Sequence, residues 1–580
     1  MKFGQLLSVV LIAGLVGVAT NVGYTYFTSD KPHPDEVKFN SFLDENWQDT
    51  MEKSPLFASL LGDKRYDDKI SSNSIDDFIA ESEYERYVLD VLNEINPNNL
   101  SEENQLNYRL LKSDYEINLE GRKYPGYYMR LNQRGGVQDY YLYGNRLNFV
   151  DLQSYKNWFE RVKGYTQNVR NSLEINREGL ELGYTQPKLV TRGVSAQIGA
   201  MLERDLEDHP YYKIFKSVGE VASAQEAEEL QNEVKDFIQN VLNPTYQELY
   251  DFLVNEYLPK SRDSIGISDV PNGKEWYEYL ARYHTTTDLT PDEIHEIGLR
   301  EVAKIRAEME GIIEQVGWDG DFNSFLQYLR TDPRFYFETG EELLQAYRAM
   351  SKEIDAYMPT LFNKLPRAPY GVIPIPMESA PFTTTAYYNA PSEGRPGYYY
   401  ANLYMPEVRP KYEIPVLSVH EAVPGHHHQI SLAQEMENVP NFRKYLSITA
   451  FVEGWGLYSE QLGESMGIYD DPYDKFGQLT YDMWRAVRLV VDTGMHYKGW
   501  SRDDAVNLFL ENTAKTEQDI NNEVDRYIAW PGQALAYKIG QLKIMELRDK
   551  SKEALGEDFD IKDFHDHILS FGSIPLSILE

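Results

Sequence analysis

The segment LSVHEAVPGHHHQIS, residues 417–431, contains four of the eleven histidines of this 580-residue chain. In the H-E-x-x-H motif, two histidines one helical turn apart bind zinc, and the glutamate after the first acts as general base on the metal-bound water. His420 and Glu421 match the start of that motif, but position 424 is proline and the next histidine is His426. At about 100° per residue, His426 would lie roughly 120° from His420 around a regular helix.

A helix interruption at Pro424-Gly425 would resolve this mismatch. Proline removes a helical hydrogen bond, and glycine tolerates unusual dihedral angles. We therefore predict a bulge that brings His426 back beside His420, so that both bind Zn²⁺. His427 is the alternative ligand, whereas His428 is expected to be uninvolved. The competing interpretation is a run of exposed histidines at a helix end, which the apolar sequence IPVLSV before His420 disfavours.

A third ligand is expected in the segment AFVEGWGLYSEQLGE, residues 450–464. Glu453 stands there among apolar and aromatic residues, where a carboxylate is costly unless it is paired or bound to a metal. Glutamate as third ligand is the pattern of thermolysin-like zinc peptidases. Glu460 and Glu464 fall toward the same side of this helix, and for both we expect a solvated face.

Two of these motifs carry a resemblance to a known family. HEAVPGHHHQ (420–429) and FVEGWGLYSE (451–460) resemble the bacterial family called domain of unknown function 885, except that His428 stands where an apolar residue is expected. Four further blocks resemble it too, so that the likeness covers most of the chain: residues 257–299, 394–403, 485–500 and 523–540. The resemblance implies an exported protein with a helical, zincin-like metallopeptidase fold.

Local patterns also predict a mainly α fold. Capping boxes at Ser223–Glu226 and Thr290–Glu293 mark helix starts. The aromatic run GYYYANLYM, residues 397–405, suits an edge strand, and VIPIP, residues 372–376, alternates but contains prolines that exclude a central strand. We expect residues 37–580 to form one catalytic domain, with a small edge sheet and two lobes around a deep cleft.

Composition limits the possible partners and compartments. The formal net charge of −35 argues against binding nucleic acid or anionic lipid. The absence of cysteine excludes disulfides, cysteine zinc sites and a lipidated cysteine. Residues 1–27 have the pattern of a signal peptide, with an uncleaved membrane anchor as the alternative, and residues 28–36 look like a tether. We expect a periplasmic or secreted protein that contacts the membrane only through such an anchor.

Hydrolysis of a peptide bond needs a donor for the developing oxyanion. Tyr527 and Tyr537 flank the segment PGQAL and are donor candidates, with His496 as a third. Arg526, next to Tyr527, is a candidate for substrate binding. For any one tyrosine among forty-four, core packing is the alternative interpretation.

Arg485, Arg488, Asp492 and His496 share one face of a predicted helix. Arg485 or Arg488 could bind a substrate carboxylate through two hydrogen bonds, and the alternative is a buried ion-pair network without substrate contact. Asp492, or another carboxylate, is expected to orient a ligating imidazole. In zinc peptidases an edge strand beside the metal helix often binds the substrate backbone, which makes Tyr400 and Asn402 candidates for that role.

Together these features predict an exported zinc peptidase that cleaves short peptides. Glu421 would take a proton from the metal-activated water and later deliver it to the leaving amine. One alternative is a catalytically degenerate protein that binds metal or peptide. Another is a metal-dependent hydrolase of a different amide or ester.

Overall fold

The computed structural model describes residues 32–377, 380–392 and 394–579. The signal peptide or anchor predicted for residues 1–27 lies outside these ranges. Helix α2 begins at Pro34, inside the segment 28–36 that was expected to be a tether. Within the described residues, no helix combines the length and the apolar character needed to cross a membrane.

The expectation of a mainly α fold is confirmed. In the first half of the chain the helices are α2 (Pro34–Lys53), α3 (Pro55–Leu60), α4 (Ile75–Asn93), α5 (Glu102–Gly121), α6 (Tyr141–Gly144), α7 (Leu152–Leu182), α8 (Lys188–Leu202), α9 (Pro210–Lys213), α10 (Ala224–Phe237), α11 (Asn243–Phe252) and α12 (Leu258–Lys260).

In the second half the helices are α13 (Gly273–Thr285), α14 (Pro291–Gln315), α15 (Phe322–Thr331), α16 (Gly340–Asp355), α17 (Met358–Leu361), α18 (Ile414–Glu421), α19 (His426–Gln434), α20 (Asn441–Tyr445), α21 (Thr449–Leu462), α22 (Pro472–Tyr497), α23 (Arg502–Asn512), α24 (Glu517–Ala529), α25 (Ala536–Leu555), α26 (Ile561–Ser570) and α27 (Leu576–Leu579).

Both predicted capping boxes are confirmed. The hydroxyl of Thr290 accepts a hydrogen bond from the backbone N–H of Glu293, and the Glu293 carboxylate accepts one from the backbone N–H of Thr290. Ser223 and Glu226 make the same reciprocal pair at the start of α10. Each box satisfies backbone N–H groups that the first helical turn leaves without partners, and so fixes where α14 and α10 begin.

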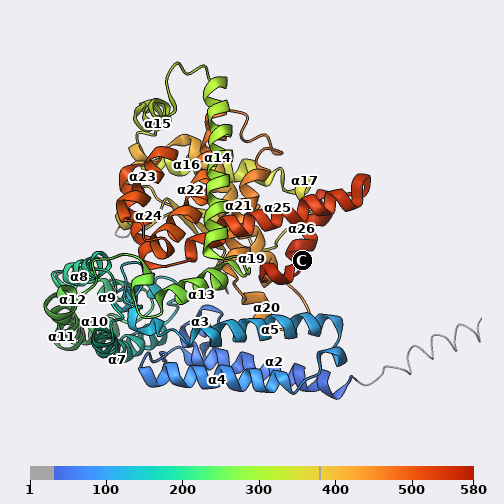
Figure 1. Cartoon of the computed structure of the whole chain (residues 1–580). Helices are drawn as coiled ribbons and strands as arrows, with labels where there is room; N and C mark the ends of the chain where they lie inside the picture. Colours follow the sequence, from blue (N-terminus) through green and yellow to red (C-terminus); the bar gives the residue numbers. More distant parts are fainter. Residues whose placement is uncertain (1–31, 378–379, 393, 580) are drawn as a thin grey trace, which may run out of the picture.

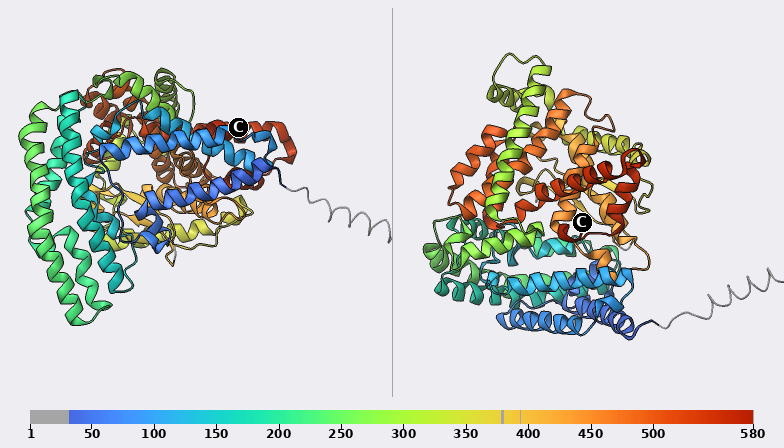
Figure 2. Two further views of the ribbon diagram at one scale, coloured as in Figure 1. Left: turned by 90° about the horizontal axis from the view of Figure 1, so that it is seen from below. Right: turned by 45° about the vertical axis from the view of Figure 1, so that its right-hand side comes forward.

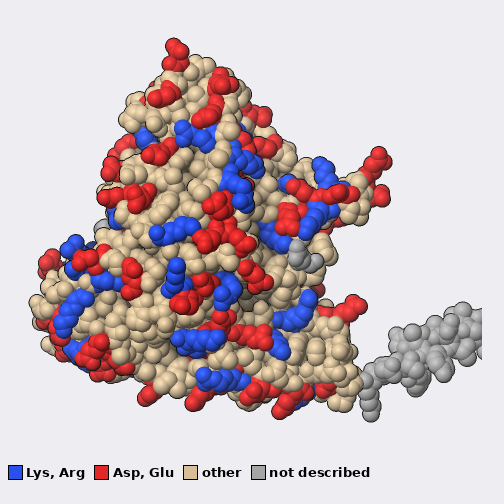
Figure 3. Space-filling model, viewed as in Figure 1, with Lys and Arg blue, Asp and Glu red and all other residues tan. Residues whose placement is uncertain are grey.

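The helices form two layers. In Figure 1, α2 to α12 lie along the lower part of the molecule and the helices from α13 onward form the body above them, an arrangement that the side views in Figure 2 also show. The lower layer has cores of its own, one between α2, α4 and α5 and one between α7, α8, α10 and α11. Charged side chains of both signs are mixed over the face drawn in Figure 3 and do not gather into one patch.

Helix α22 runs through the centre of the upper layer. Every residue from Phe476 to His496 is buried, because α14, α23 and α24 cover one side of the helix and α18, α21 and α25 pack on others. A helix that is covered on all sides must find partners for each polar side chain it carries. The charged residues of α22 are therefore held in defined contacts inside the protein.

The sheet has three strands in the order β1-β3-β2. Strand β1 (Tyr370–Pro374) pairs parallel with β3 (Gly397–Ala401), and β2 (Ala386–Asn389) pairs antiparallel with β3. The prediction that residues 397–405 contain an edge strand is wrong, since β3 is central and pairs with β1 on one side and β2 on the other. The outer position of β1 is as its prolines required, and β2 is the edge strand beside α18.

Candidate metal centre

The helix that carries His420 is interrupted at the predicted place. Helix α18 ends at Glu421, Ala422 leaves helical geometry with φ −97° and ψ −110°, and α19 begins at His426. The backbone N–H of Gly425 donates to the carbonyl of Val419, and the indole N–H of Trp455 donates to the carbonyl of Pro424. These two bonds satisfy groups that the interruption removes from the regular helical ladder.

Glycine is required at position 425 by a close approach of the backbone to itself. A Cβ atom there would lie 2.0 Å from the carbonyl oxygen of His420 and 2.5 Å from that of Val419. Both contacts are with backbone atoms, which have no side-chain freedom to move away. The Pro-Gly pair therefore lets the chain fold back tightly enough for α19 to start beside the end of α18.

The interruption brings the three predicted ligands together. Nε2 of His420 lies 3.7 Å and Nε2 of His426 lies 3.5 Å from Oε2 of Glu453, and the ligand atoms of the three residues are all within 4.8 Å of one another. The two imidazole rings stand nearly perpendicular, at 84°. Gly456, one turn after Glu453, permits this approach, because a Cβ there would lie 2.8 Å from Cε1 of His420.

These residues fit a zinc ion in both chemistry and spacing. A tetrahedral zinc with bonds of about 2.1 Å separates neighbouring ligand atoms by about 3.4 Å, close to the two imidazole–carboxylate distances. Two imidazole nitrogens and one carboxylate oxygen form the ligand set of catalytic zinc sites, in which the fourth position is left to water or substrate. Their role as zinc ligands stays a prediction.

Glu460 supports the centre from behind, and the expectation that it lies on a solvated face is wrong. Its side chain is fully buried, and its Oε1 accepts a hydrogen bond of 2.8 Å from Nδ1 of His420. That bond leaves Nε2 of His420 facing Glu453. Glu460 follows Glu453 by seven residues, about two helical turns, so that both carboxylates lie on one face of α21. This seven-residue spacing was the signal in the sequence that Glu460 lies on the same side of the helix as Glu453 and could orient His420.

The pKa values of the residues at the centre are shifted by burial and by the charges of their neighbours. Burial alone lowers the pKa of His420, but the neighbouring carboxylates of Glu453 and Glu460 outweigh burial and raise the pKa to about 9. Burial opposes ionisation of Glu453, yet the two imidazoles hold the pKa of that carboxyl well below its usual range. Burial raises the pKa of Glu421, against the opposing effect of His420 and His426.

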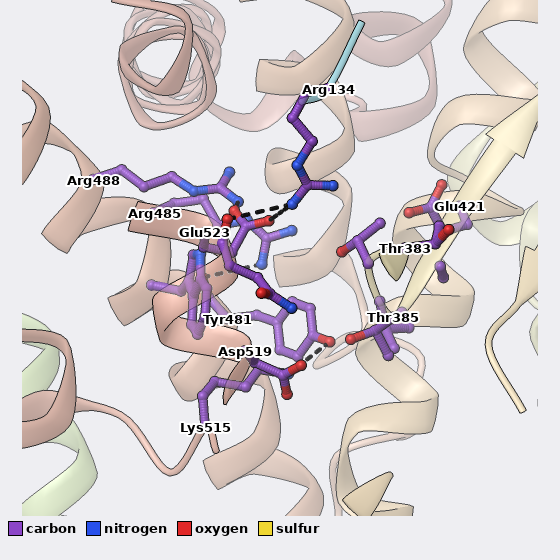
Figure 4. Close-up of a pocket in the computed structure, with 15 residues that line it drawn as sticks. Arg134, Thr383, Thr385, Glu421, Tyr481, Arg485, Arg488, Lys515, Asp519 and Glu523 are labelled. Atoms are coloured by element: carbon purple, nitrogen blue, oxygen red, sulfur yellow. Dashed lines mark hydrogen bonds and ion pairs between the residues drawn. The ribbon is translucent and has the colours of Figure 1, made fainter. Parts of the chain in front are cut away.

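Glu421 connects the three ligand residues to a cleft, drawn in Figure 4. The cleft holds about 620 Å³ of space, part of it open to solvent. It is lined from α18 by Leu417 and Glu421, from β2 and the loop before it by Thr383 to Ala386, from α22 by Tyr481, Trp484, Arg485 and Arg488, from the region of α24 by Lys515, Asp519, Asn522 and Glu523, and from the lower layer by Arg134.

A group of cations stands across the cleft from Glu421 in Figure 4. Arg488 and Arg134 approach Glu523 to 3.1 Å and 3.7 Å, and Arg526 approaches the same carboxylate from behind to 3.0 Å. Arg485 lies 3.6 Å from Glu460. Arg485 and Arg488 thus line the cleft, and their role in substrate binding stays a prediction, while Arg526 is not among the residues that line it.

The three predicted oxyanion donors lie outside the cleft lining. The hydroxyl of Tyr527 accepts from Trp484 and Arg488 and donates to Glu523. Tyr537 packs its ring against the guanidinium of Arg488, 4.5 Å away. Tyr527 and Tyr537 therefore contact Arg488, and neither lines the cleft.

Both ring nitrogens of His496 form hydrogen bonds with backbone groups. Its Nδ1 accepts from the N–H of Ile267 and its Nε2 donates to the carbonyl of Tyr527. Burial lowers its pKa to about 4, so that the ring is neutral near pH 7. Asp492, four residues earlier, accepts from the hydroxyl of Tyr277 and the N–H of Gly532, whereas the carboxylate that orients a candidate ligand is Glu460.

The two candidates for binding the substrate backbone, one on β3 and one just after it, lie in different surroundings. Tyr400 stacks on Tyr387 across the strand pair and is not in the cleft lining. Asn402 is fully buried, and its side-chain N–H groups donate to the carbonyls of Ala380, Thr383 and Thr384. Asn402 therefore holds the loop that forms one wall of the cleft, although it does not itself reach the cleft.

The other two histidines of the motif face away from the centre. Nε2 of His427 donates to the carbonyl of Ala368 and Nδ1 accepts from the hydroxyl of Tyr388, so both nitrogens are engaged. His428 is buried against Phe362, with ring centroids 4.2 Å apart. Of the two alternatives for the second ligand, the geometry favours His426.

The fold and site define a mainly helical protein with a His-His-Glu centre beside a cleft. The chain belongs to the family described as bacterial protein of unknown function (DUF885), whose profile matches residues 55–580. Among curated proteins, none matches this sequence.

Two solved structures are similar over nearly the whole chain. A protein of Colwellia psychrerythraea, provisionally described as a lipoprotein, is 27% identical, with a TM-score of 0.88 over 94% of this chain and 98% of that one. A protein of Shewanella oneidensis, provisionally described as a lipoprotein of unknown function, is 17% identical, with a TM-score of 0.73 over 93% of this chain and 98% of that one. The second likeness concerns the fold alone.

Proposed function

We propose that this protein is an exported, zinc-dependent peptidase that hydrolyses short peptides. One observation carries the proposal. The ligand atoms of His420, His426 and Glu453 lie within 4.8 Å of one another, next to a buried Glu421 that opens on a cleft. A carboxylate adjacent to a histidine ligand is the arrangement that a metal-dependent hydrolase needs, since it places a base beside the site where water is activated.

Each residue has a role that follows from its position. A zinc ion held by His420, His426 and Glu453 would polarise the scissile carbonyl and make a water molecule more acidic. Glu421 takes the proton of the attacking water and delivers it to the leaving amine. Glu460 holds the imidazole of His420 in the tautomer that directs Nε2 at the metal.

The cleft supports a small substrate with ends or polar groups to bind. The lining is rich in hydroxyl, guanidinium and carboxylate groups, which can bind the polar groups and charged ends of a peptide. Export is supported by the pattern of residues 1–27 and by the description of the similar Colwellia protein as a lipoprotein.

The test is digestion of a defined peptide library by purified protein, with and without a chelator, together with metal analysis. We expect stoichiometric zinc, cleavage that stops on chelation and returns with zinc, and no cleavage by Glu421→Gln, which keeps its zinc. Zinc bound without cleavage of any peptide would instead indicate a binding protein or a hydrolase of another bond. Cleavage by zinc-loaded Glu421→Gln at the wild-type rate would remove Glu421 as the base.

A further inference from the structure

We propose that the arginine cluster of the cleft, Arg134, Arg485 and Arg488, binds the free α-carboxylate of a peptide, so that the enzyme removes residues from the C-terminus. This inference rests on the proposed peptidase function and specifies its substrate class. It begins from a concentration of guanidinium groups in one cleft of a chain whose formal net charge is −35.

Several of these guanidinium groups gather around one carboxylate. Glu523 is approached by three guanidinium groups, those of Arg134, Arg488 and Arg526. Burial opposes ionisation of Glu523, but these arginines hold the pKa of its carboxyl far below the usual range. Lys515, which also lines the cleft, is paired with Glu413, and the carboxylates of Glu421 and Asp519 line the same cleft.

Two N–H groups of these arginines have no acceptor among the described residues, although each guanidinium also contacts an aromatic ring and a carboxylate. Arg485 and Arg488 are each 93% buried, since 7% of each residue is exposed. Among the described residues, Nε of Arg485 and Nη1 of Arg488 have no hydrogen-bond partner. Buried guanidinium N–H groups without acceptors are costly, and a carboxylate offers acceptors in the planar arrangement that matches them.

The cluster lies close to the candidate metal centre. Arg485 contacts Glu460 at 3.6 Å, and Glu460 bonds His420 at 2.8 Å, so only one side chain separates this arginine from a ligand. Arg485 is also among the groups whose charge acts on Glu421. Arg134, Arg485 and Arg488 line the same cleft as Glu421, so a carboxylate bound at the cluster would hold the end of a peptide in the cleft that the candidate base borders.

The reaction is then removal of one amino acid. The oxygen of water bonds to the carbonyl carbon of the penultimate residue, and the C–N bond of the last peptide group breaks. Glu421 carries a proton from the water to the leaving nitrogen. The products are a peptide shortened by one residue and a free amino acid, and no other reactant is needed.

The inference is tested with two acetylated tetrapeptides of one sequence, one a C-terminal acid and the other its amide. Zinc-loaded enzyme should release the last residue of the acid with a kcat/KM about 100-fold above that for the amide, since one charge-assisted contact is worth roughly 10-fold or more. Calorimetry on zinc-loaded Glu421→Gln should show at least about 10-fold tighter binding of the acid.

Two arginine variants from one loop sharpen the test. Arg134 contacts the carbonyl of Asn522 and Glu523, and none of the candidate ligands, so Arg134→Gln should keep its zinc. It should lower kcat/KM for the acid about 10-fold and leave the amide nearly unchanged. Arg130→Gln, an exposed arginine outside the cleft lining, is the matched control and should match wild type on both peptides.

The outcomes separate this inference from the peptidase proposal. Zinc-dependent cleavage that is internal, or equal for acid and amide, would overturn the carboxylate subsite and leave the peptidase standing. Equal binding of the two peptides by Glu421→Gln, including no binding of either, would also overturn it. Selective binding of the acid without cleavage by the zinc-loaded wild type would keep the subsite and reject the peptidase.

Discussion

Nδ1 of His420 donates a 2.8 Å hydrogen bond to the carboxylate of Glu460, which is fully buried. This bond fixes which ring nitrogen of His420 faces Glu453. Partners of this kind orient metal-binding imidazoles and raise their basicity. The support of the candidate centre therefore comes from the same helix as its third ligand.

Glu460→Gln should weaken zinc binding by about 10-fold to 100-fold, because the amide offers a weaker acceptor to His420. Competition with a chromogenic chelator measures the zinc affinity. Glu464→Gln is the control, since Glu464 lies just beyond the end of α21 at Leu462 and is exposed. Equal zinc affinity of Glu460→Gln and wild type would show that the hydrogen bond to His420 does not tune the centre.

Gly425→Ala should disrupt the junction between α18 and α19. The added Cβ would meet two backbone carbonyl oxygens at 2.0 and 2.5 Å, so the backbone must move and His426 with it. We expect a loss of stability of about 3 kcal/mol or more and of zinc binding, read by thermal unfolding and metal analysis.

Gly311→Ala in α14 is the control for this glycine. No atom lies within 4 Å of the Cβ that it adds, and alanine favours a helix over glycine by about 0.5–1 kcal/mol. Zinc affinity should be unchanged and the melting temperature the same or higher. Retention of zinc and stability in Gly425→Ala would contradict the steric argument.

Asn402→Ala should loosen the cleft wall formed by residues 383–385. The variant leaves the carbonyls of Ala380, Thr383 and Thr384 and the N–H of Tyr404 without their side-chain partner, at a cost of about 2–4 kcal/mol in stability. We expect a raised KM with zinc retained.

Asn176→Ala is the matched control for Asn402→Ala. Asn176 is also buried and donates to a carbonyl, that of Ser172, but it lies in α7, away from the cleft. It should lower stability without changing KM. The same KM in both variants would argue that the loop position does not depend on Asn402.

The protein should lose stability as the pH falls from about 6.5 to about 4. Burial lowers the pKa of His496 to about 4, and does the same for His209, His284 and His565. In that window the unfolded chain binds protons that the folded protein does not, so the free energy of unfolding decreases with decreasing pH. One such histidine contributes on the order of 3 kcal/mol at most.

Calorimetric unfolding across pH 4–8 measures this dependence. His496→Gln should melt lower than wild type at pH 7.5, where it loses a backbone hydrogen bond, but should lose less further stability on acidification. His567→Gln, at an exposed position, should follow the wild-type curve. An acid dependence that is as steep in His496→Gln as in wild type would contradict the assignment.

The local sequence was enough to predict the helix interruption and the three candidate ligands. Pro424 and Gly425 leave the backbone few alternatives, and the spacing between His420 and His426 is usable only if the helix breaks there. The spacing of Glu453 and Glu460 places both on one face of a predicted helix. Whether that face is solvated or contacts His420 depends on burial, and the sequence of one helix does not show which of its residues the rest of the protein buries.

Other features depended on residues far apart in the chain. Arg134 meets Glu523 across 389 positions of sequence, which no local pattern encodes. The hydroxyl of Tyr527 and the nitrogens of His496 looked available in the sequence, but packing assigns them partners. Strand β3 has the composition of an edge strand and is central, because pairing partners arrive from both sides.

What the sequence by itself determined is what a few adjacent residues constrain: the capped helix starts, the break at Pro424-Gly425 and the chemistry of the candidate ligands. The tertiary structure decided which polar groups line the cleft and which form hydrogen bonds inside the core. The physical reason is that hydrogen bonds and burial are settled between segments, so a side chain's availability depends on neighbours that the local sequence does not contain.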